Sequence, residues 1–478
     1  MERAEAEAIY EQGREAVVAV LLALSAQVAA LQAQLEKQEE RIAELEQRLG
    51  RTSRNSSLPP SQDPPGAPPR PRQVSSGRGR GAQPGHKGHG RPLVPSEAAD
   101  EIIEYWPEYC HCGHRFTEVE RRPARVPLRH QVAELPRVAV TITEHRLNHL
   151  RCPRCGRITR AAFPAEVPLG AFGPRLQAAV ATLAVRNRVS RRDTVELMDE
   201  LFGARLSAGS VDAILGRAST ALMLPYQELL HHIRAAPAVN VDETGWRTAG
   251  GRRTLWGALT PRTAVFRIAP DRHEREATAL LGEHFAGIAS SDRWWAYDYL
   301  DPERRQVCWA HLARDFTAHA EGLGAQKQFG EAGVALTKRL FATWDDYRAG
   351  DDRERLAERT ELLKEEMRAL LLAATQKSPR NRRHRGFARN LLKLWPALWM
   401  FASVPGVEPT NNHAERGLRG AVILRKLSLG SQSEAGERTI ERLLSASVTC
   451  RLQKRSLFAY LSEVLAADVR GSACPSLA

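Results

Sequence analysis

Three acidic residues stand where strands or helices are expected to begin or end, and their chemistry is that of metal ligands. Asp242 follows the short apolar run 239–241, and Asp292 follows the run 288–291. Glu415 comes after a Pro- and Gly-containing break at 405–409, where a helix is expected to begin. Carboxylates that meet at one point suit Mg²⁺, which prefers hard oxygen ligands and keeps several waters. Such a site can cleave phosphodiesters with two metal ions.

Spacing alone does not select these three residues, because the chain contains 56 acidic residues. Taken one at a time, each has an ordinary structural role that explains it better. Asp242 then is a solvated acid at a strand end, Asp292 a helix N-cap, and Glu415 an acid favoured by a helix dipole. Asn411 or Asn412 is a suitable N-cap, which puts Glu415 in the first helical turn or just past it.

The segments around these acids predict an α/β sheet core. Residues 254–259 and 264–268 are β-rich runs joined by a Pro-containing turn, 274–285 is helix-like, and 306–309 is a further short apolar run. This strand–hairpin–helix–strand–strand order suits a sheet whose neighbouring strand ends bring acids together. We also expect mostly helix over 310–401 and again over 433–467.

Four of the seven cysteines cluster within residues 99–165, which predicts a small zinc-binding domain. Cys152 and Cys155 have the two-residue spacing and following glycine of a zinc knuckle, whereas Cys110 and Cys112 have a single intervening residue. The odd total and the clustering argue against a disulfide framework and indicate a reducing compartment. The expected structural zinc ligands are Cys110, Cys112, Cys152 and Cys155, with His111 or His114 as a substitute in the first pair.

Residues 1–50 predict a coiled coil. Apolar residues recur at alternating steps of three and four over four heptads, and no Gly or Pro interrupts residues 14–49. The alternatives are a dimerisation zipper and a long helix folded back on its own domain. We favour the zipper, with polar Gln38 at one core position. The other core positions are Leu21, Leu24, Val28, Leu31, Leu35, Ile42, Leu45 and Leu49.

Residues 51–98 form a Pro/Gly-rich basic linker that should not fold alone. Residues 51–95 hold ten prolines and eight Arg or Lys against one acid, Asp63. The net charge of the whole chain is +13, which favours a polyanionic partner such as nucleic acid. Residues 166–234 are predicted to be helical, with a helix–turn–helix shape in which Ser190 caps one helix and Ser207 or Ser210 begins the next.

The motifs around the acids resemble the transposases of the insertion sequence 66 family, and the resemblance covers nearly the whole chain. Two sequence departures fall at the site: the family often has Pro where Gly245 precedes Trp246, and Gly where Arg293 follows Asp292. The motifs are Gln83-Pro84-Gly85-His86-Lys87-Gly88-His89, Val241-Asp242-Glu243-Thr244, Ser291-Asp292, Cys308-Trp309-Ala310-His311, and Asn411-Asn412-His413-Ala414-Glu415-Arg416-Gly417-Leu418-Arg419 leading to Arg425-Lys426.

The resemblance implies a ribonuclease-H-like catalytic core over 235–430, with a helical insertion at 312–405 and a C-terminal helical segment at 431–478. It implies an Asp-Asp-Glu triad at Asp242, Asp292 and Glu415 that binds Mg²⁺ or Mn²⁺, cleaves transposon ends and joins them to target DNA. The alternatives are a hydrolytic nuclease on the same fold and a zinc-containing DNA-binding regulator. Cys308 and His311 are expected to pack and orient the site rather than to bind zinc.

The expected partners are double-stranded DNA, a second copy of the chain through the zipper, and accessory transposition proteins. We expect a cytoplasmic, nucleoid-associated protein, because there is no signal peptide and the apolar run 17–24 is too short to cross a bilayer. Six basic residues within or after the insertion are predicted to contact DNA phosphates: Arg382, Arg383, Arg385, Arg416, Arg425 and Lys426.

Overall fold

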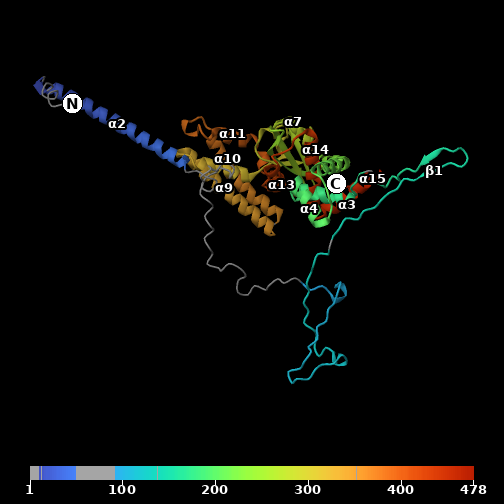
Figure 1. Cartoon of the computed structure of the whole chain (residues 1–478). Helices are drawn as coiled ribbons and strands as arrows, with labels where there is room; N and C mark the ends of the chain where they lie inside the picture. Colours follow the sequence, from blue (N-terminus) through green and yellow to red (C-terminus); the bar gives the residue numbers. More distant parts are fainter. Residues whose placement is uncertain (1–9, 12, 50–91, 137, 169, 351) are drawn as a thin grey trace. The chain divides into compact units, whose positions relative to one another are not determined.

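The computed structural model describes residues 10–11, 13–49, 92–136, 138–168, 170–350 and 352–478 (Figure 1). The chain divides into two compact units. One comprises Met1–Ala67, Glu144–Asp199 and Arg205–Ala478, and the other comprises Pro68–Thr143 and Glu200–Ala204. The boundary between them falls inside the predicted zinc-binding segment 99–165. Most of the predicted linker, residues 51–91, lies outside the described residues, as does the motif at 83–89.

The predicted N-terminal helix is confirmed as α2 (Arg14–Leu49). Its apolar heptad side chains are exposed, among them Leu21, Leu31 and Leu35. By length and composition, the stretch Arg14–Leu35 of α2 is also apolar enough to cross a membrane. The expectation that this region is too short was wrong, because it counted only the uninterrupted run 17–24 and not the Ala-rich turns that continue it.

A five-stranded mixed sheet forms the centre of the larger unit, in the order β5-β4-β3-β6-β7. Strand β4 pairs antiparallel with both β3 and β5, whereas β6 pairs parallel with both β3 and β7. The predicted strand–hairpin–helix–strand–strand order is confirmed, although β3 is much longer than its apolar run. The bounds are β3 (Ala238–Thr248), β4 (Gly251–Leu259), β5 (Ala264–Ala269), α7 (Glu274–Leu281), β6 (Ile288–Ser291) and β7 (Arg305–Val307).

Helices precede, interrupt and follow this sheet, as Figure 1 shows. The predicted cap at Ser190 is confirmed, because its Oγ accepts the Asp193 N–H (3.1 Å). Ser207 likewise caps α5 by accepting the Ser210 N–H (3.0 Å). Before the sheet lie β1 (His149–Arg151), β2 (Ile158–Arg160), α3 (Pro174–Ala181), the π-helical Thr182–Arg186, α4 (Arg191–Phe202), α5 (Ala208–Ala221) and α6 (Met223–Ala235).

The helical stretch expected over 310–401 is also confirmed. It forms its own apolar core, in which Phe316, Leu363 and Trp399 are buried. Gly330 and Gly333 of α9 allow close packing on α8, since an added Cβ would lie 2.0 Å from atoms of Ala320 or Phe316. The helices are α8 (Trp309–Ala320), α9 (Gly324–Ala349), α10 (Arg353–Thr375), α11 (Arg385–Lys393) and α12 (Met400–Ser403), followed by α13 (Asn412–Ser428), α14 (Glu434–Leu452) and α15 (Leu457–Arg470). Short 3₁₀ turns lie at Ser96–Ala98, Glu118–Glu120, Trp295–Tyr297 (η5), Pro302–Arg304, Pro379–Asn381 and Pro396–Leu398.

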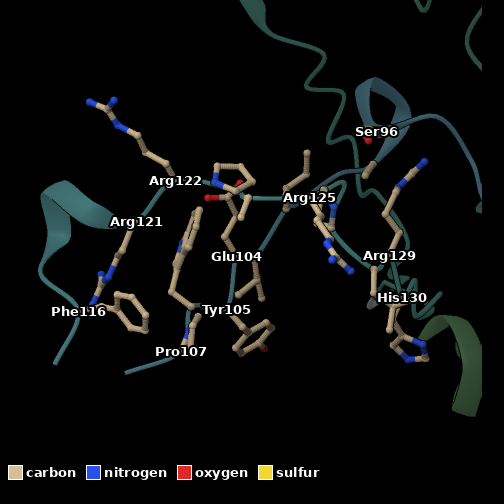
Figure 2. A pocket seen from close by; sticks show the side chains of 18 of the residues that line it. Ser96, Glu104, Tyr105, Pro107, Phe116, Arg121, Arg122, Arg125, Arg129 and His130 are labelled. Atoms are coloured by element: carbon tan, nitrogen blue, oxygen red, sulfur yellow. The ribbon is translucent and has the colours of Figure 1, made fainter. Parts of the chain in front are cut away.

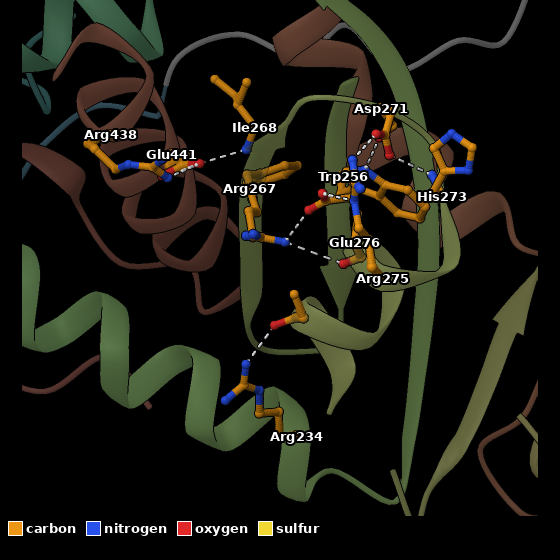
Figure 3. Close-up of polar contacts among 12 residues, drawn as sticks. Arg234, Trp256, Arg267, Ile268, Asp271, His273, Arg275, Glu276, Arg438 and Glu441 are labelled. Carbon is orange, nitrogen blue, oxygen red and sulfur yellow. Dashed lines mark hydrogen bonds and ion pairs between the residues drawn. The ribbon is translucent and has the colours of Figure 1, made fainter. Parts of the chain in front are cut away.

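The outer edge of β5 is covered by helix α14 rather than by another strand. Backbone N–H groups of Ala264, Phe266 and Ile268 donate to Thr449 Oγ1 (3.0 Å), Ser445 Oγ (2.9 Å) and Glu441 Oε1 (2.6 Å), respectively. Figure 3 shows the last of these bonds, with Arg438 pairing to Glu441. The three N–H donors are two residues apart along β5, and their acceptors are four residues apart along α14, so the donors share one side of the strand and the acceptors one face of the helix. An exposed strand edge invites pairing with other chains, and this arrangement removes it.

Ser445→Ala should destabilise the protein by about 1–3 kcal/mol, because it leaves the buried Phe266 N–H without an acceptor. We expect a lower melting temperature and faster hydrogen exchange in β5. Thr439→Ala on the exposed side of α14 is the matched control and should change stability by less than about 0.5 kcal/mol. Equal effects of the two substitutions would contradict the role assigned to this helix.

Candidate active site

Strand register brings Asp242 alongside Asp292. Asn240 of β3 pairs with Ser290 of β6 in the parallel ladder, and both acids follow two residues later. Neighbouring strands lie about 4.8 Å apart. Asp242 lies within β3 itself, opposite Gly257 of β4, and Asp292 directly follows the last residue of β6. Two residues that are 50 positions apart in the sequence therefore meet at one edge of the sheet.

Asn411 ties the helix that carries Glu415 to the same strand. Its fully buried side chain donates to the Val241 carbonyl oxygen (2.7 Å) and accepts a hydrogen bond from Asn240 (3.1 Å). Its backbone N–H donates to Cys308 Sγ (3.2 Å). Asn411 is the N-cap residue of α13, as predicted, but its side chain makes no capping hydrogen bond because it is bound to β3 instead. Glu415 does lie in the first turn of α13.

Asp242 is the carboxyl group most affected by its surroundings. Its pKa is raised to about 8, chiefly by burial and also by the nearby charges of Glu243, Asp292 and Glu415. A hydrogen bond from the Glu243 N–H to Asp242 Oδ1 (2.9 Å) opposes this rise. A carboxyl group with this pKa is largely protonated at neutral pH unless a cation compensates its charge.

The donor set fits a hard divalent cation, although the side chains are not gathered around one point. Within the described residues, no three His, Cys, Asp or Glu side chains form a group that could hold an ion as they stand. Asp292 Oδ1 accepts the Trp294 N–H (2.8 Å), as Asp242 accepts a backbone donor. Glu415 Oε1 is buried and has no hydrogen-bond partner among the described residues. A buried carboxylate oxygen that lacks a hydrogen bond and lies near two further acids is the observation that favours Mg²⁺ here.

A second buried acid, Glu243, was missed by the sequence analysis. Its side chain is only 1% exposed, and it accepts hydrogen bonds from Tyr297 Oη (2.6 Å) and from Arg272. Burial and the charge of Asp292 raise its pKa, whereas the bonds from Tyr297 and Arg272 lower it. Glu243 was visible only as the residue after Asp242, since its partners are 29 and 54 positions away.

Two arginines fix the loop that carries Asp292. Arg305 of β7 is fully buried and donates to the carbonyl oxygens of Asp292 (2.8 Å) and Trp294 (3.2 Å), while pairing with Asp298 (2.9 Å). Arg293 pairs with Asp315 of α8 (2.8 Å) and donates to Asn390 of α11 (2.8 Å). The departure from Gly at position 293 therefore links the site to the helical segment.

Of the remaining motif residues, Cys308 and His311 lie next to Asn411 and Glu415. Cys308 is buried at the start of α8, where burial raises the pKa of its thiol. His311 Nε2 and Arg314 lie 3.8 and 3.7 Å from Glu415 Oε1. Trp246 is a core residue, 2% exposed, whose indole N–H donates to Ser431 Oγ (3.2 Å). It does not lie at the rim of the site.

The six predicted DNA-contacting residues lie in two regions. Arg382 and Arg383 are exposed just before α11, and Arg385 is its first residue. Arg416 and Lys426 are exposed on α13. Arg425 points back to the sheet, because it donates to the Gly245 carbonyl oxygen and lies 3.5 Å from Thr244 Oγ1. Arg425 therefore has a structural contact that the sequence did not indicate.

The cysteine pairs belong to different units, and each forms a tight turn. The Cys110 N–H donates to the His114 carbonyl oxygen (2.8 Å), and Gly113 has φ +93°. The Cys152 N–H donates to the Arg157 carbonyl oxygen (2.8 Å), and Gly156 has φ +74°. Backbone N–H groups, first that of His114, lower the pKa of the Cys112 thiol, and those of Cys155 and Arg154 lower that of Cys152. Both turns favour thiolates.

Together, these features define an α/β protein whose mixed sheet carries acids on two adjacent parallel strands, one within β3 and one directly after β6. The family comparison agrees with this class. The sequence model of the transposase IS66 family matches residues 170–439, which is more than half of the chain. The chain belongs to the IS66 transposase family. A family of unknown function matches residues 2–92.

Three relatives come from Sinorhizobium fredii (strain NBRC 101917 / NGR234), and each is an uncharacterized protein. The chain is 26% identical to y4qI over 59% of its length, 25% identical to y4hP over 79%, and 24% identical to y4jD over 57%. The matches cover 56%, 73% and 58% of the relatives. The chain thus spans little more than half the length of two of them.

In the absence of metal, Asp242→Asn should stabilise the protein increasingly as the pH rises. A folded-state pKa of about 8, against an ordinary 3.8, means that the favourable contribution of protonation is complete below about pH 4. It is lost as the pH rises through about 8. At pH 9 in EDTA, the variant should exceed wild type by about 2–4 kcal/mol, measured by urea unfolding.

Mg²⁺ or Mn²⁺ should stabilise wild type at pH 9 and so remove much of that difference, because a cation compensates the buried charge. The variant should respond less to either ion. If wild type and Asp242→Asn show parallel stability profiles from pH 5 to 9, the burial assigned to this carboxylate is wrong.

Proposed function

We propose that this protein is a DNA transposase that cleaves transposon ends and joins them to target DNA, with Asp242, Asp292 and Glu415 as its metal ligands. The observation that carries the proposal is the buried carboxyl of Asp242, whose pKa is raised by both other acids. Three acids held together against their repulsion are unfavourable in a folded protein unless a cation binds them. Membership of the IS66 transposase family supports this choice of reaction.

We further propose a ribonuclease-H-like core. Numbered along the chain, its strands lie in the order third, second, first, fourth, fifth, with the first three antiparallel and the last two joined in parallel. This order supports the proposal, as does the insertion of helices α8–α12 between Asp292 and Glu415.

In this proposal the protein's own residues hold and orient the reacting strand. Bound at the three carboxylates, Mg²⁺ or Mn²⁺ supplies Lewis-acid activation of the attacking and leaving oxygens. Asn411 and Arg305 fix the backbones that carry Glu415 and Asp292. Arg314, beside Glu415, adds positive charge at the edge where a phosphate would lie. His311 also lies beside Glu415 and adds charge only when it is protonated. Arg416 and Lys426, exposed on α13, are suited to phosphates of the same strand.

Asp242→Asn and Glu415→Gln should each lower strand cleavage and joining about 10³-fold, because a lost ligand removes several kcal/mol of transition-state stabilisation. The assay uses a labelled duplex with the element's end, a plasmid target and Mg²⁺, and gels report cleaved and joined strands separately. Glu365→Gln, an exposed acid on α10, is the matched control.

Cleavage and joining that survive both substitutions would reject the assigned residues. Asp242-dependent cleavage without any joined product would instead favour the hydrolytic nuclease. DNA binding without cleavage by wild type would favour the regulator.

The smaller unit has a surface suited to the DNA backbone. A hollow of about 720 Å³ is lined by Arg121, Arg122, Arg125 and Arg129 (Figure 2). Residues 121–130 contain no acid, although Glu101, Glu104 and Glu120 also line the hollow. Arginines spaced along an extended segment can follow successive phosphates. We therefore assign this unit, together with Arg382, Arg383 and Arg385, to DNA contact outside the catalytic residues.

We also propose that Cys110, Cys112, Cys152 and Cys155 are ligands of structural zinc. The two turns have glycines at positive φ and thiols whose pKa is lowered, which suits thiolate ligands. His114 contacts Glu120 (3.3 Å), whereas His111 remains a possible substitute for a cysteine of the first pair.

Purified protein should contain about one zinc per chain, and Cys152→Ser should remove at least half of it, since a structural site needs four ligands. Elemental analysis measures the metal content. Cys474→Ser, far from both pairs in the sequence, is the control and should leave zinc unchanged. Zinc-free protein that is fully active would overturn the assignment.

Finally, we propose that α2 pairs with α2 of a second copy as a coiled coil, in a cytoplasmic, nucleoid-associated protein that accessory transposition proteins assist. The exposed heptad residues Leu21, Leu24, Val28 and Leu31 support pairing. Charged residues occupy much of the second half of the helix, which favours a coiled coil over a membrane span.

A further inference from the structure

Exposed aromatic rings border the candidate acids. Trp294 and Trp295 follow Asp292 within three positions, and Trp295 is 45% exposed. Its ring centroid lies 5.3 Å from that of His273 and 5.7 Å from that of Trp294. We call these three rings the aromatic ledge. Large exposed aromatic surfaces cost free energy in water, so their place beside the acids calls for a ligand.

The aromatic ledge is held rigidly by both loops that form it. The guanidinium of Arg272 lies 4.3 Å above the Trp294 ring, and the Trp294 indole N–H donates to the Arg272 carbonyl oxygen (3.0 Å). Asp271 accepts the His273 N–H (3.0 Å) and pairs with Arg275, as Figure 3 shows. The Trp294 N–H donates to Asp292 itself (2.8 Å). The rings are therefore fixed relative to the carboxylates before any ligand binds.

The chemistry of the aromatic ledge matches a nucleobase with its phosphate. Base–aromatic stacking contributes about 1–3 kcal/mol per base, and a nearby arginine adds cation–π and phosphate contacts. Arg272 is 43% exposed, although Glu243 also binds it, so part of its guanidinium faces solvent. A paired base inside a duplex cannot present its face to a protein ring, whereas an unpaired base can.

We propose that the aromatic ledge stacks an unpaired base of the DNA strand, extruded next to the phosphodiester that the acids cleave. This inference rests on the proposed function, because it takes the strand at Asp292 to be DNA at a transposon end. Trp295 is then a positioning residue that holds the opened end in place. Trp294 supports it while linking the stack to Asp292.

The test measures binding without cleavage. The full chain, without added Mg²⁺ or Mn²⁺, is titrated into two fluorescent duplexes that carry the element's end, one fully paired and one with a single unpaired nucleotide at the cleavage position. Wild type should bind the second duplex more tightly. Trp295→Ala should weaken that binding about tenfold and change binding to the paired duplex less than twofold. Trp295→Phe should restore the preference.

Leu323→Ala removes an equally exposed apolar side chain, 55% exposed before α9, and should bind both duplexes as wild type does. The proposal is overturned if Trp295→Ala weakens binding to both duplexes equally, or weakens binding to neither. It is also overturned if that variant only changes the oligomeric state, which would make the ledge a protein contact. Failure of the proposed function has a separate readout: the wild-type protein would then cleave neither duplex in Mg²⁺.

Discussion

Repulsion between the Asp242 carboxylate and the acids around it is the constraint that the sheet and its surrounding helices must satisfy. Asp242 sits where burial and three neighbouring acids all disfavour its charge. Such an arrangement persists only if the backbones that carry the acids cannot move apart. Parallel pairing of β3 with β6 fixes Asp242 against Asp292. Asn411, buried and hydrogen-bonded to β3 and Cys308, fixes the helix of Glu415.

The fold could be anticipated from the sequence where local pattern decides structure. The short β-rich runs and the caps at Ser190 and Ser207 are local features, and they were predicted correctly. The length of β3 was not, because Glu243-Thr244-Gly245 lacks a strand pattern. Its extension depends on pairing with β4 as far as Thr248 and Gly251. That pairing is a tertiary effect which no window of sequence contains.

The candidate site was predictable only through its motifs. Local sequence patterns gave each of the three acids a plausible role but could not select them from the 56 acidic residues of the chain. Glu243, Arg272 and Arg305 were missed because their roles come from partners distant in sequence. Arg305 precedes the predicted run 306–309 and was assigned no role, yet it is fully buried and donates to the Asp292 carbonyl oxygen. A buried arginine must be paired on several sides, and only the structure shows its partners.

The Asp292 loop is held from two directions, and this couples the helical segment to the acids. Arg305 binds it from the sheet, whereas Arg293 binds Asp315 and Asn390 of helices α8 and α11. The basic residues Arg382 and Arg383 lie at the entrance to α11. A DNA strand bound to these two arginines would act on helix α11. Asn390 of this helix accepts a hydrogen bond from Arg293, which follows Asp292 in the sequence. Arg293, where the family often has glycine, thus exchanges backbone freedom for a direct side-chain link between helices α8 and α11 and the candidate site.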